Sequence, residues 1–196
     1  NALNGGNGID TMIGGKGDDT YTINTLTDLL VENAGEGIDT ISSSIAFDLN
    51  TVANIENLTL TGSAALNGTG DDGDNRLNGN TGANLLVGNG GSDTITGGTG
   101  ADTMRGGLGN DVFVIGTTFV DVLEENPGEG FDTVNAQMTF DLTSVANIEN
   151  LTLANGGAFN GFGDAGNNRI TGNTSANSLD GRDGNDTLNG GNGTDT

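Results

Sequence analysis

The stretch Gly97–Val114 reads G-G-T-G-A-D-T-M-R followed at once by G-G-L-G-N-D-V-F-V, two copies of one nine-residue pattern. Each copy has glycine at its first, second and fourth positions, aspartate at the sixth and an apolar residue at the eighth. A unit this short can bury its apolar side chain only by stacking on its neighbours. The stretch therefore predicts a solenoid of short strands separated by glycine-rich turns.

The nine-residue spacing continues on both sides of this stretch. An aspartate or asparagine recurs at that spacing in three series: Asp10 and Asp19; Asn75, Asn84, Asp93, Asp102 and Asp111; Asn168, Asn177, Asp186 and Asp195. Two residues after each of them, where the chain extends that far, comes an apolar or aromatic residue. We expect these residues to form the core: Met12, Tyr21, Leu77, Leu86, Ile95, Met104, Phe113, Ile170, Leu179 and Leu188.

A second, longer period of 93 residues contains the first. The segment Phe47–Leu60 returns as Phe140–Leu153 with 12 of 14 positions identical, and Gly35–Thr40 returns as Gly128–Thr133. The first residues show neither an initiator methionine nor a signal peptide. We therefore expect this chain to be a piece of a longer tandem array.

The composition excludes several classes of function. The chain has 27 acidic and 5 basic residues, a net charge of −22, and neither cysteine nor histidine. It can have no disulfides, no thiolate or imidazole metal sites, and no Ser-His or Cys-His catalytic system. The acidic balance argues against partners such as nucleic acid or anionic membranes, and no apolar run approaches the length of a membrane span. Such a charge also predicts disorder unless a cation neutralises it.

The pattern resembles the RTX family of secreted bacterial proteins, whose motif G-G-x-G-x-D-x-U-x is a calcium-binding repeat. Gly5–Ile13, Gly14–Thr22, Gly97–Arg105 and Gly106–Val114 match it at every position. The resemblance implies an all-β fold, a right-handed parallel β-roll or β-solenoid with calcium-binding turns. In that fold two nonapeptides complete one coil, so residues 18 apart stack on the same side.

The resemblance also implies the metal ligands. The motif aspartates are expected to donate carboxylates to several Ca²⁺ ions: Asp10, Asp19, Asp93, Asp102, Asp111, Asp186 and Asp195. Turn glycines are expected to donate backbone carbonyls: Gly6, Gly8, Gly15, Gly17, Gly98, Gly100, Gly107, Gly109, Gly191 and Gly193. The asparagines at the same position (Asn75, Asn84, Asn168 and Asn177) are expected to form metal-free hydrogen-bonded turns, with a ligand role as the alternative.

Electrostatic repulsion between the stacked motif aspartates predicts that the fold requires a metal ion. Carboxylates on neighbouring coils, about 4.8 Å apart, repel by about 3.5 kcal/mol at an effective dielectric constant near 20. A divalent cation between them reverses the sign of the interaction. A set of carboxylate and carbonyl oxygens suits the flexible coordination of Ca²⁺ better than the octahedral demands of Mg²⁺.

These patterns divide the chain into two repeat units. Residues 1–103 comprise RTX turns (5–22), a spacer (23–69) and Asn/Asp nonapeptides (70–103); residues 104–196 comprise an RTX turn (106–114), a spacer (115–162) and nonapeptides (163–196). The spacers repeat a set of acidic residues that favours a solvated face with turn residues, with one extra metal site per period as the alternative. They are Asp28, Glu32, Glu36 and Asp39, recurring as Asp121, Glu124 or Glu125, Glu129 and Asp132.

Three functions compete at this level. The first is a non-catalytic, calcium-folded structural module of a secreted bacterial surface protein, adhesin or extracellular fibre, with possible end-to-end self-association. The second is the C-terminal secretion and folding tail of an enzyme or toxin whose catalytic part lies outside this chain. The third, catalysis by a carboxylate pair as in glycosidases, is disfavoured because the repeat turns account for the carboxylates. We expect no enzymatic activity from the chain itself.

Overall fold

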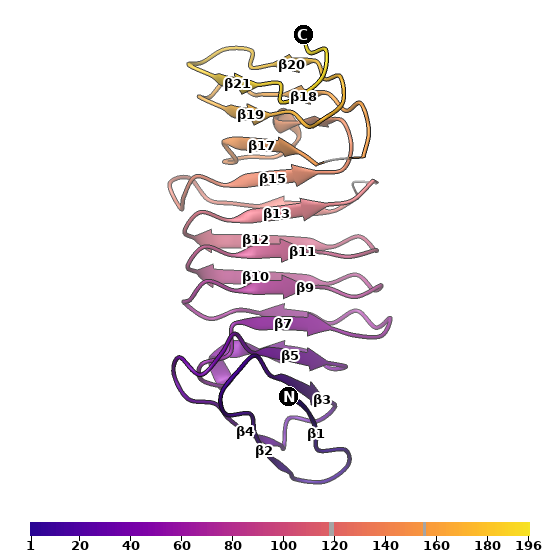
Figure 1. Ribbon diagram of the computed structural model, residues 1–196, viewed down its shortest axis with the longest axis vertical. Helices are drawn as coiled ribbons and strands as arrows, with labels where there is room; N and C mark the ends of the chain where they lie inside the picture. Colours follow the sequence, from indigo (N-terminus) through magenta and orange to yellow (C-terminus); the bar gives the residue numbers. More distant parts are fainter. Residues whose placement is uncertain (118–119, 155) are drawn as a thin grey trace.

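The computed structural model describes residues 1–117, 120–154 and 156–196; the remaining three residues fall in the second spacer. The chain winds into a stack of coils whose strands lie one above another, with the two termini at opposite ends (Figure 1). The expected all-β class and the parallel β-solenoid are confirmed. Within the described residues the helical segments are two short 3₁₀ turns, η1 (Leu49–Thr51) and η2 (Leu142–Ser144), and no helix is long and apolar enough to span a membrane.

One long parallel sheet runs along the whole stack. Its eleven strands, counted over the described residues, are β1 (Ala2–Asn4), β3 (Thr20–Ile23), β5 (Thr40–Ser43), β7 (Asn57–Leu60), β9 (Arg76–Asn78), β11 (Thr94–Thr96), β13 (Val112–Ile115), β15 (Thr133–Ala136), β17 (Asn150–Leu153), β19 (Arg169–Thr171) and β21 (Thr187–Asn189). They pair in this order, each with the next odd-numbered strand.

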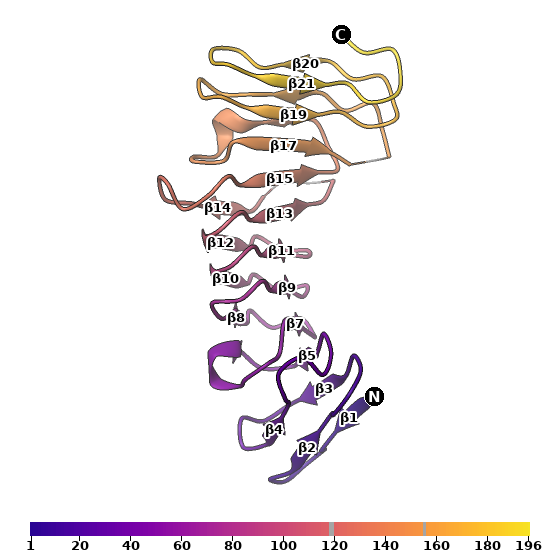
Figure 2. The same ribbon diagram turned by 60° about the vertical axis from the view of Figure 1, so that its left-hand side comes forward.

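The opposite side of the stack is divided into shorter parallel sheets, and the middle one of these lies to the left of the long sheet in Figure 2. β2 (Thr11–Ile13) pairs with β4 (Leu29–Val31). A second sheet contains β6 (Phe47–Asp48), β8 (Asn67–Thr69), β10 (Leu85–Gly90), β12 (Thr103–Leu108) and β14 (Val122–Glu124). A third contains β16 (Phe140–Asp141), β18 (Gly161–Phe162) and β20 (Leu179–Asp180).

The strand register confirms that two nonapeptides make one coil. Ile95 pairs with Phe113 in the long sheet and Leu86 pairs with Met104 opposite, both offsets of 18 residues. Spacer coils have other lengths: Thr40 pairs with Asn57, whereas Val112 pairs with Thr133. The spacers therefore continue the same stack through coils of unequal length.

In most strands a residue near the middle faces inward and contributes to the core. Tyr21, Ile41, Leu58, Leu77, Ile95 and Phe113 are fully buried along the long sheet, and Leu86 and Met104 meet them from the other side. The expectation for Leu188 is wrong, because its side chain is 46% exposed. It lies in β21, the last strand of the long sheet, which has a neighbour on one side only.

Candidate calcium-binding turns

The motif acids form a hydrogen-bonded ladder along the turns that precede the long sheet. In each rung, one carboxylate oxygen accepts a hydrogen bond from the backbone N–H of the equivalent residue one coil earlier. Asp93 Oδ1 accepts from Asn75, Asp111 Oδ1 from Asp93, and Asp132 Oδ1 from Asp111, all at 2.8 Å. Asp39 likewise accepts from Asp19 at 2.8 Å. The fold therefore places these carboxylates directly above one another.

A second ladder runs along the turns that precede the opposite sheets. Asp102 Oδ1 accepts from the N–H of Asn84 at 2.8 Å, and Asp121 Oδ1 accepts from Asp102 at 3.0 Å. Asp28 Oδ1 accepts from Asp10 at 3.1 Å. The C-terminal block repeats the arrangement on both edges, with Asp186 bound to Asn168 and Asp195 bound to Asn177, each at 2.9 Å.

The spacer acids thus fall into two groups. Asp28, Asp39, Asp121 and Asp132 occupy the same rung position as the motif aspartates, in register with them. Glu32 does not belong to a ladder: it reaches the first ladder from a neighbouring turn, where a carboxylate oxygen of each of Asp19, Glu32 and Asp39 lies within 4.8 Å of the other two.

The second carboxylate oxygen of the ladder residues is the feature that points to a metal. Within the described part of the chain, Oδ2 is buried and without a hydrogen-bond partner in six aspartates: Asp10, Asp19, Asp28, Asp93, Asp102 and Asp111. Four of these residues are at most 1% exposed: Asp19, Asp93, Asp102 and Asp111. An unpaired buried carboxylate oxygen is costly. Ca²⁺, a cation that binds through oxygen, therefore fits these donors.

The asparagine turns contrast with this arrangement. Asn84 Oδ1 accepts from the N–H of Asn80 at 2.8 Å, and its Nδ2 donates to Leu66 O at 2.9 Å. Asn168 Oδ1 accepts from Asp164 in the same way, and its Nδ2 donates to Glu149 O. The amide closes the turn with neutral hydrogen bonds, which supports the metal-free interpretation of these coils.

The ten turn glycines named as carbonyl ligands all have positive φ, from 78° at Gly6 and Gly15 to 136° at Gly8. At Gly100 a side chain is also excluded by space, because a Cβ there would lie 2.8 Å from Gly82 O in the coil below, whereas Gly6 and Gly15 face open space. Glycine therefore suits the turns chiefly because it adopts positive φ at least cost. Metal binding through the glycine carbonyls stays a prediction.

Two turns depart from the motif at its second glycine, where Asn89 and Arg182 stand. Both residues have positive φ, 80° and 65°. Asn89 Nδ2 donates to Gly70 O at 2.8 Å, and Arg182 Nη1 donates to Gly163 O. Each side chain thus makes a hydrogen bond to the preceding coil. Arg182 also forms a bidentate ion pair with Asp141 at 2.7 Å, which lowers the pKa of that carboxyl.

Burial dominates the electrostatics of the ladder. Loss of solvent raises the pKa of Asp93 to about 7, with the Asp111 charge adding to the effect. Burial likewise raises the pKa of Glu125 to about 7 and of Asp132 to about 6. The pKa values of Asp102, Asp111 and Asp39 are raised for the same reason. Without a cation, the folded chain holds these carboxylates in an environment that disfavours their charge.

These raised pKa values predict that the stability of the metal-free fold falls as the pH rises. A carboxyl with a raised pKa in the fold stabilises the fold below its unfolded pKa of about 4, and that contribution is lost as the pH rises through 6 to 7. In calcium-free buffer, the chain should therefore keep more of its β-type circular dichroism signal at pH 5 than at pH 8. Saturating calcium should abolish this preference for acid. A calcium-free stability that rises with pH would contradict the interpretation.

The structure adds two ladder residues that the sequence analysis missed. Glu56 Oε2 accepts from the N–H of Asp39 at 2.8 Å, and Glu149 Oε2 accepts from Asp132 at 3.0 Å. Both stand in the segment A-N-I-E-N that is identical in the two units, immediately before β7 and β17. The identity of this segment in the two units could have indicated a shared role for the two glutamates. The segment lacks the glycine pattern of the motif, however, so the sequence did not place these glutamates in the ladder.

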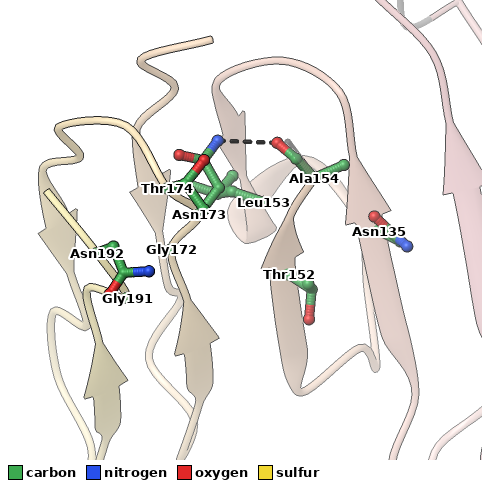
Figure 3. Close-up of a pocket in the computed structure, with 9 residues that line it drawn as sticks. All are labelled: Asn135, Thr152, Leu153, Ala154, Gly172, Asn173, Thr174, Gly191 and Asn192. Atoms are coloured by element: carbon green, nitrogen blue, oxygen red, sulfur yellow. Dashed lines mark hydrogen bonds between the residues drawn. The ribbon is translucent and has the colours of Figure 1, made fainter. Parts of the chain in front are cut away.

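One open hollow on the surface is lined by residues without acid–base side chains. This open depression of about 610 Å³ lies along the edge of β17, β19 and β21, and Figure 3 shows its lining. Its lining residues, which include Asn135, Thr152 and Asn173, carry no ionisable side chain. Asn173 Nδ2 donates to Ala154 O at 2.8 Å and so ties adjacent coils together.

Comparison with known proteins agrees with the ladder geometry. The family model described as RTX calcium-binding nonapeptide repeat (4 copies) matches residues 1–22, 69–104, 78–113 and 162–196, together just over half of the chain. Endo-1,3-1,4-beta-glycanase ExsH of Rhizobium meliloti is 46% identical over 69 residues, which cover 35% of this chain and 14% of that protein. The chain therefore matches only a small part of the glycanase.

Proposed function

Because this chain belongs to the RTX calcium-binding nonapeptide-repeat family, we propose that it is a non-catalytic module that calcium folds into a rigid rod within a secreted bacterial protein. The motif aspartates are its ligands, with Asp28, Asp39, Asp121 and Asp132 as spacer members of the same ladders. The observation that carries this proposal is the set of buried Oδ2 atoms without hydrogen-bond partners.

The long tandem period favours a structural role. The 93-residue unit repeats with its spacer, and the two units stack coaxially through one continuous sheet. A module of this shape extends a protein by a fixed length for each unit added. A surface protein, adhesin or extracellular fibre uses such a rod as a stalk. The open edges at β1 and β21 are where further coils, or another copy of the chain, would pair.

Secretion fits the chemistry of the chain. Its charge of −22 keeps the metal-free chain extended by self-repulsion, which suits export of an unfolded polypeptide from a compartment low in calcium. Millimolar calcium outside the cell then neutralises the ladders and folds the rod, in the affinity range typical of extracellular calcium modules. We propose type I secretion as the route.

Small-angle scattering and negative-stain microscopy of the calcium-loaded chain test the structural role. Isolated rods are expected, or rods joined end to end if copies self-associate. A compact globule in calcium would contradict the proposal. Incubation with a 1,3-1,4-β-glucan should release no reducing sugar, and calcium-dependent hydrolysis by the purified chain would show that it is an enzyme.

The partial match to a glycanase favours a second candidate function. The chain would then be the RTX tail of a larger secreted hydrolase, assisting its export and folding while the catalytic domain lies elsewhere in the protein. The complete gene sequence separates the two candidates. A catalytic domain encoded upstream of these repeats would favour the tail, whereas further 93-residue units would favour the stalk.

A further inference from the structure

A buried glutamate stands in each spacer outside every RTX motif. Glu32 follows β4 and Glu125 follows β14, 93 residues apart, and their exposures are only 8% and 9%. Glutamate is rarely this buried unless it is paired. Glu124, the neighbour that the sequence left as an alternative, is exposed and pairs with Arg105 instead. The structure thus assigns Glu125 as the counterpart of Glu32.

Each glutamate reaches the last RTX turn of its block. In the first unit, carboxylate oxygens of Asp19, Glu32 and Asp39 lie within 4.8 Å of one another, and all three residues are buried. In the second unit, Glu125 accepts hydrogen bonds from the N–H groups of Gly106 and Gly107. A Cβ at Gly106 would collide with both Asp111 Oδ2 and Glu125 Oε1, so these oxygens face the same small space.

An independent observation points to a ligand in this space. Asp19 Oδ2 and Asp111 Oδ2 are buried and have no hydrogen-bond partner, in residues that are 1% and 0% exposed. Oδ1 of Asp111 is already used by the backbone of Asp93, so Oδ2 is the oxygen left over. Among the described residues, no lysine or arginine pairs with either trio of acids; the N-terminal ammonium of Asn1 pairs with Oδ1 of Asp19 and leaves its Oδ2 without a partner.

Hydrogen bonding by itself explains the clustering of these carboxylates less well than a bound cation does. Glu32 accepts from the hydroxyl of Tyr21 at 2.5 Å and from its own loop at Asn33, and Glu125 caps two glycines. Such bonds hold the glutamates in place. They leave the Asp Oδ2 atoms unsatisfied. In the first unit three carboxylates lie close together, and in the second unit Asp111 Oδ2 and Glu125 Oε1 face one space, an arrangement that a cation between the oxygens or protonation relieves.

We propose that Asp19, Glu32 and Asp39, and likewise Asp111, Glu125 and Asp132, form a second class of calcium site, one per 93-residue unit. The site lies where the RTX turns meet the first spacer coil. The spacer glutamate supplies a carboxylate where another RTX turn would supply backbone carbonyls. This inference rests on the proposed calcium-binding function and extends it to residues outside the motif. The site fastens each spacer to its block.

The glutamates allow the site to be tested without altering any RTX motif. Glu125→Gln keeps the size and one of the two hydrogen-bond acceptor oxygens but removes the charge, and Glu124→Gln on the exposed neighbour is the matched control. Native mass spectrometry in calcium should show one Ca²⁺ fewer for Glu125→Gln and an unchanged count for Glu124→Gln. An unchanged count for both variants overturns the proposal while leaving the RTX sites intact.

Tyr21 provides a second readout, because it is the only tyrosine of a chain without tryptophan. Its hydroxyl touches Glu32, so Tb³⁺ bound beside that glutamate should emit when the tyrosine is excited. Glu32→Gln should lower this emission at limiting Tb³⁺ by about tenfold, whereas Glu36→Gln should not. Equal emission from both variants contradicts the site. If the unmodified chain binds neither ion, the proposed function itself fails.

Discussion

Removal of calcium with EGTA at neutral pH is expected to unfold the chain completely, with loss of its β-type circular dichroism signal. Each site occupied at 100 times its Kd adds about 2.7 kcal/mol to stability. Several such sites together match or exceed the roughly 5 to 15 kcal/mol that separates ordinary folded domains from their unfolded chains. Without the metal, the buried aspartate oxygens have no partner and the carboxylates repel along both ladders.

The transition should be steep in calcium concentration. The ladders run through consecutive coils, and each rung bonds to the backbone of the coil before it, so one occupied site helps to order the next. A calcium titration followed by circular dichroism should therefore give a sigmoidal curve. Mg²⁺ at the same concentration should not restore the signal, because it dehydrates reluctantly. A strong β signal in EGTA would show that the fold does not depend on metal.

The substitution Asp93→Asn is expected to have opposite effects on the two states of the protein. In calcium it removes a charged ligand from the centre of the middle block, and we expect binding there to weaken about 10- to 100-fold, or about 1.4 to 2.8 kcal/mol. Without calcium it removes a buried carboxylate whose pKa is raised to about 7. The metal-free chain should then be more stable than the parent at pH 8.

The asparagine turns already present in the chain explain why the substituted turn should still form. Asn75 occupies the rung one coil before Asp93, and its Oδ1 accepts from the N–H of Asp71 at 2.7 Å. Urea denaturation at pH 8 in calcium measures the first effect. Without calcium, circular dichroism between pH 5 and pH 8 measures the second, because the variant should stay folded to a higher pH than the parent. Asp72→Asn, at an exposed turn residue, is the control and should change neither. Loss of stability in both states would mean that Asp93 acts through its hydrogen bond to Asn75 instead of through metal.

The repeats determined much of this protein from sequence alone. The nine-residue spacing was sufficient to predict a solenoid and the inward-facing positions such as Ile95 and Phe113, and the resemblance to the RTX family implied the parallel β-roll and the 18-residue coil. The spacing was sufficient because each residue class in the motif has one physical role. Glycine allows the turn, the apolar residue fills the core and aspartate marks the edge. Local sequence therefore carries most of the information about the repeated coils.

The tertiary structure decided how the spacers join this pattern. Their ladder rungs are 17 to 21 residues apart, so the nine-residue spacing could not align Glu56 or Glu149 with the motif aspartates. The nine-residue spacing also could not distinguish Glu125 from its neighbour Glu124. In the structure Glu125 is buried, whereas Glu124 is exposed and pairs with Arg105. Which carboxylate oxygens are left without partners depends on contacts between coils. The sequence by itself determined the repeating calcium-binding turn. Only the stacking of coils of unequal length decided which spacer acids lie in the same ladders as the motif aspartates.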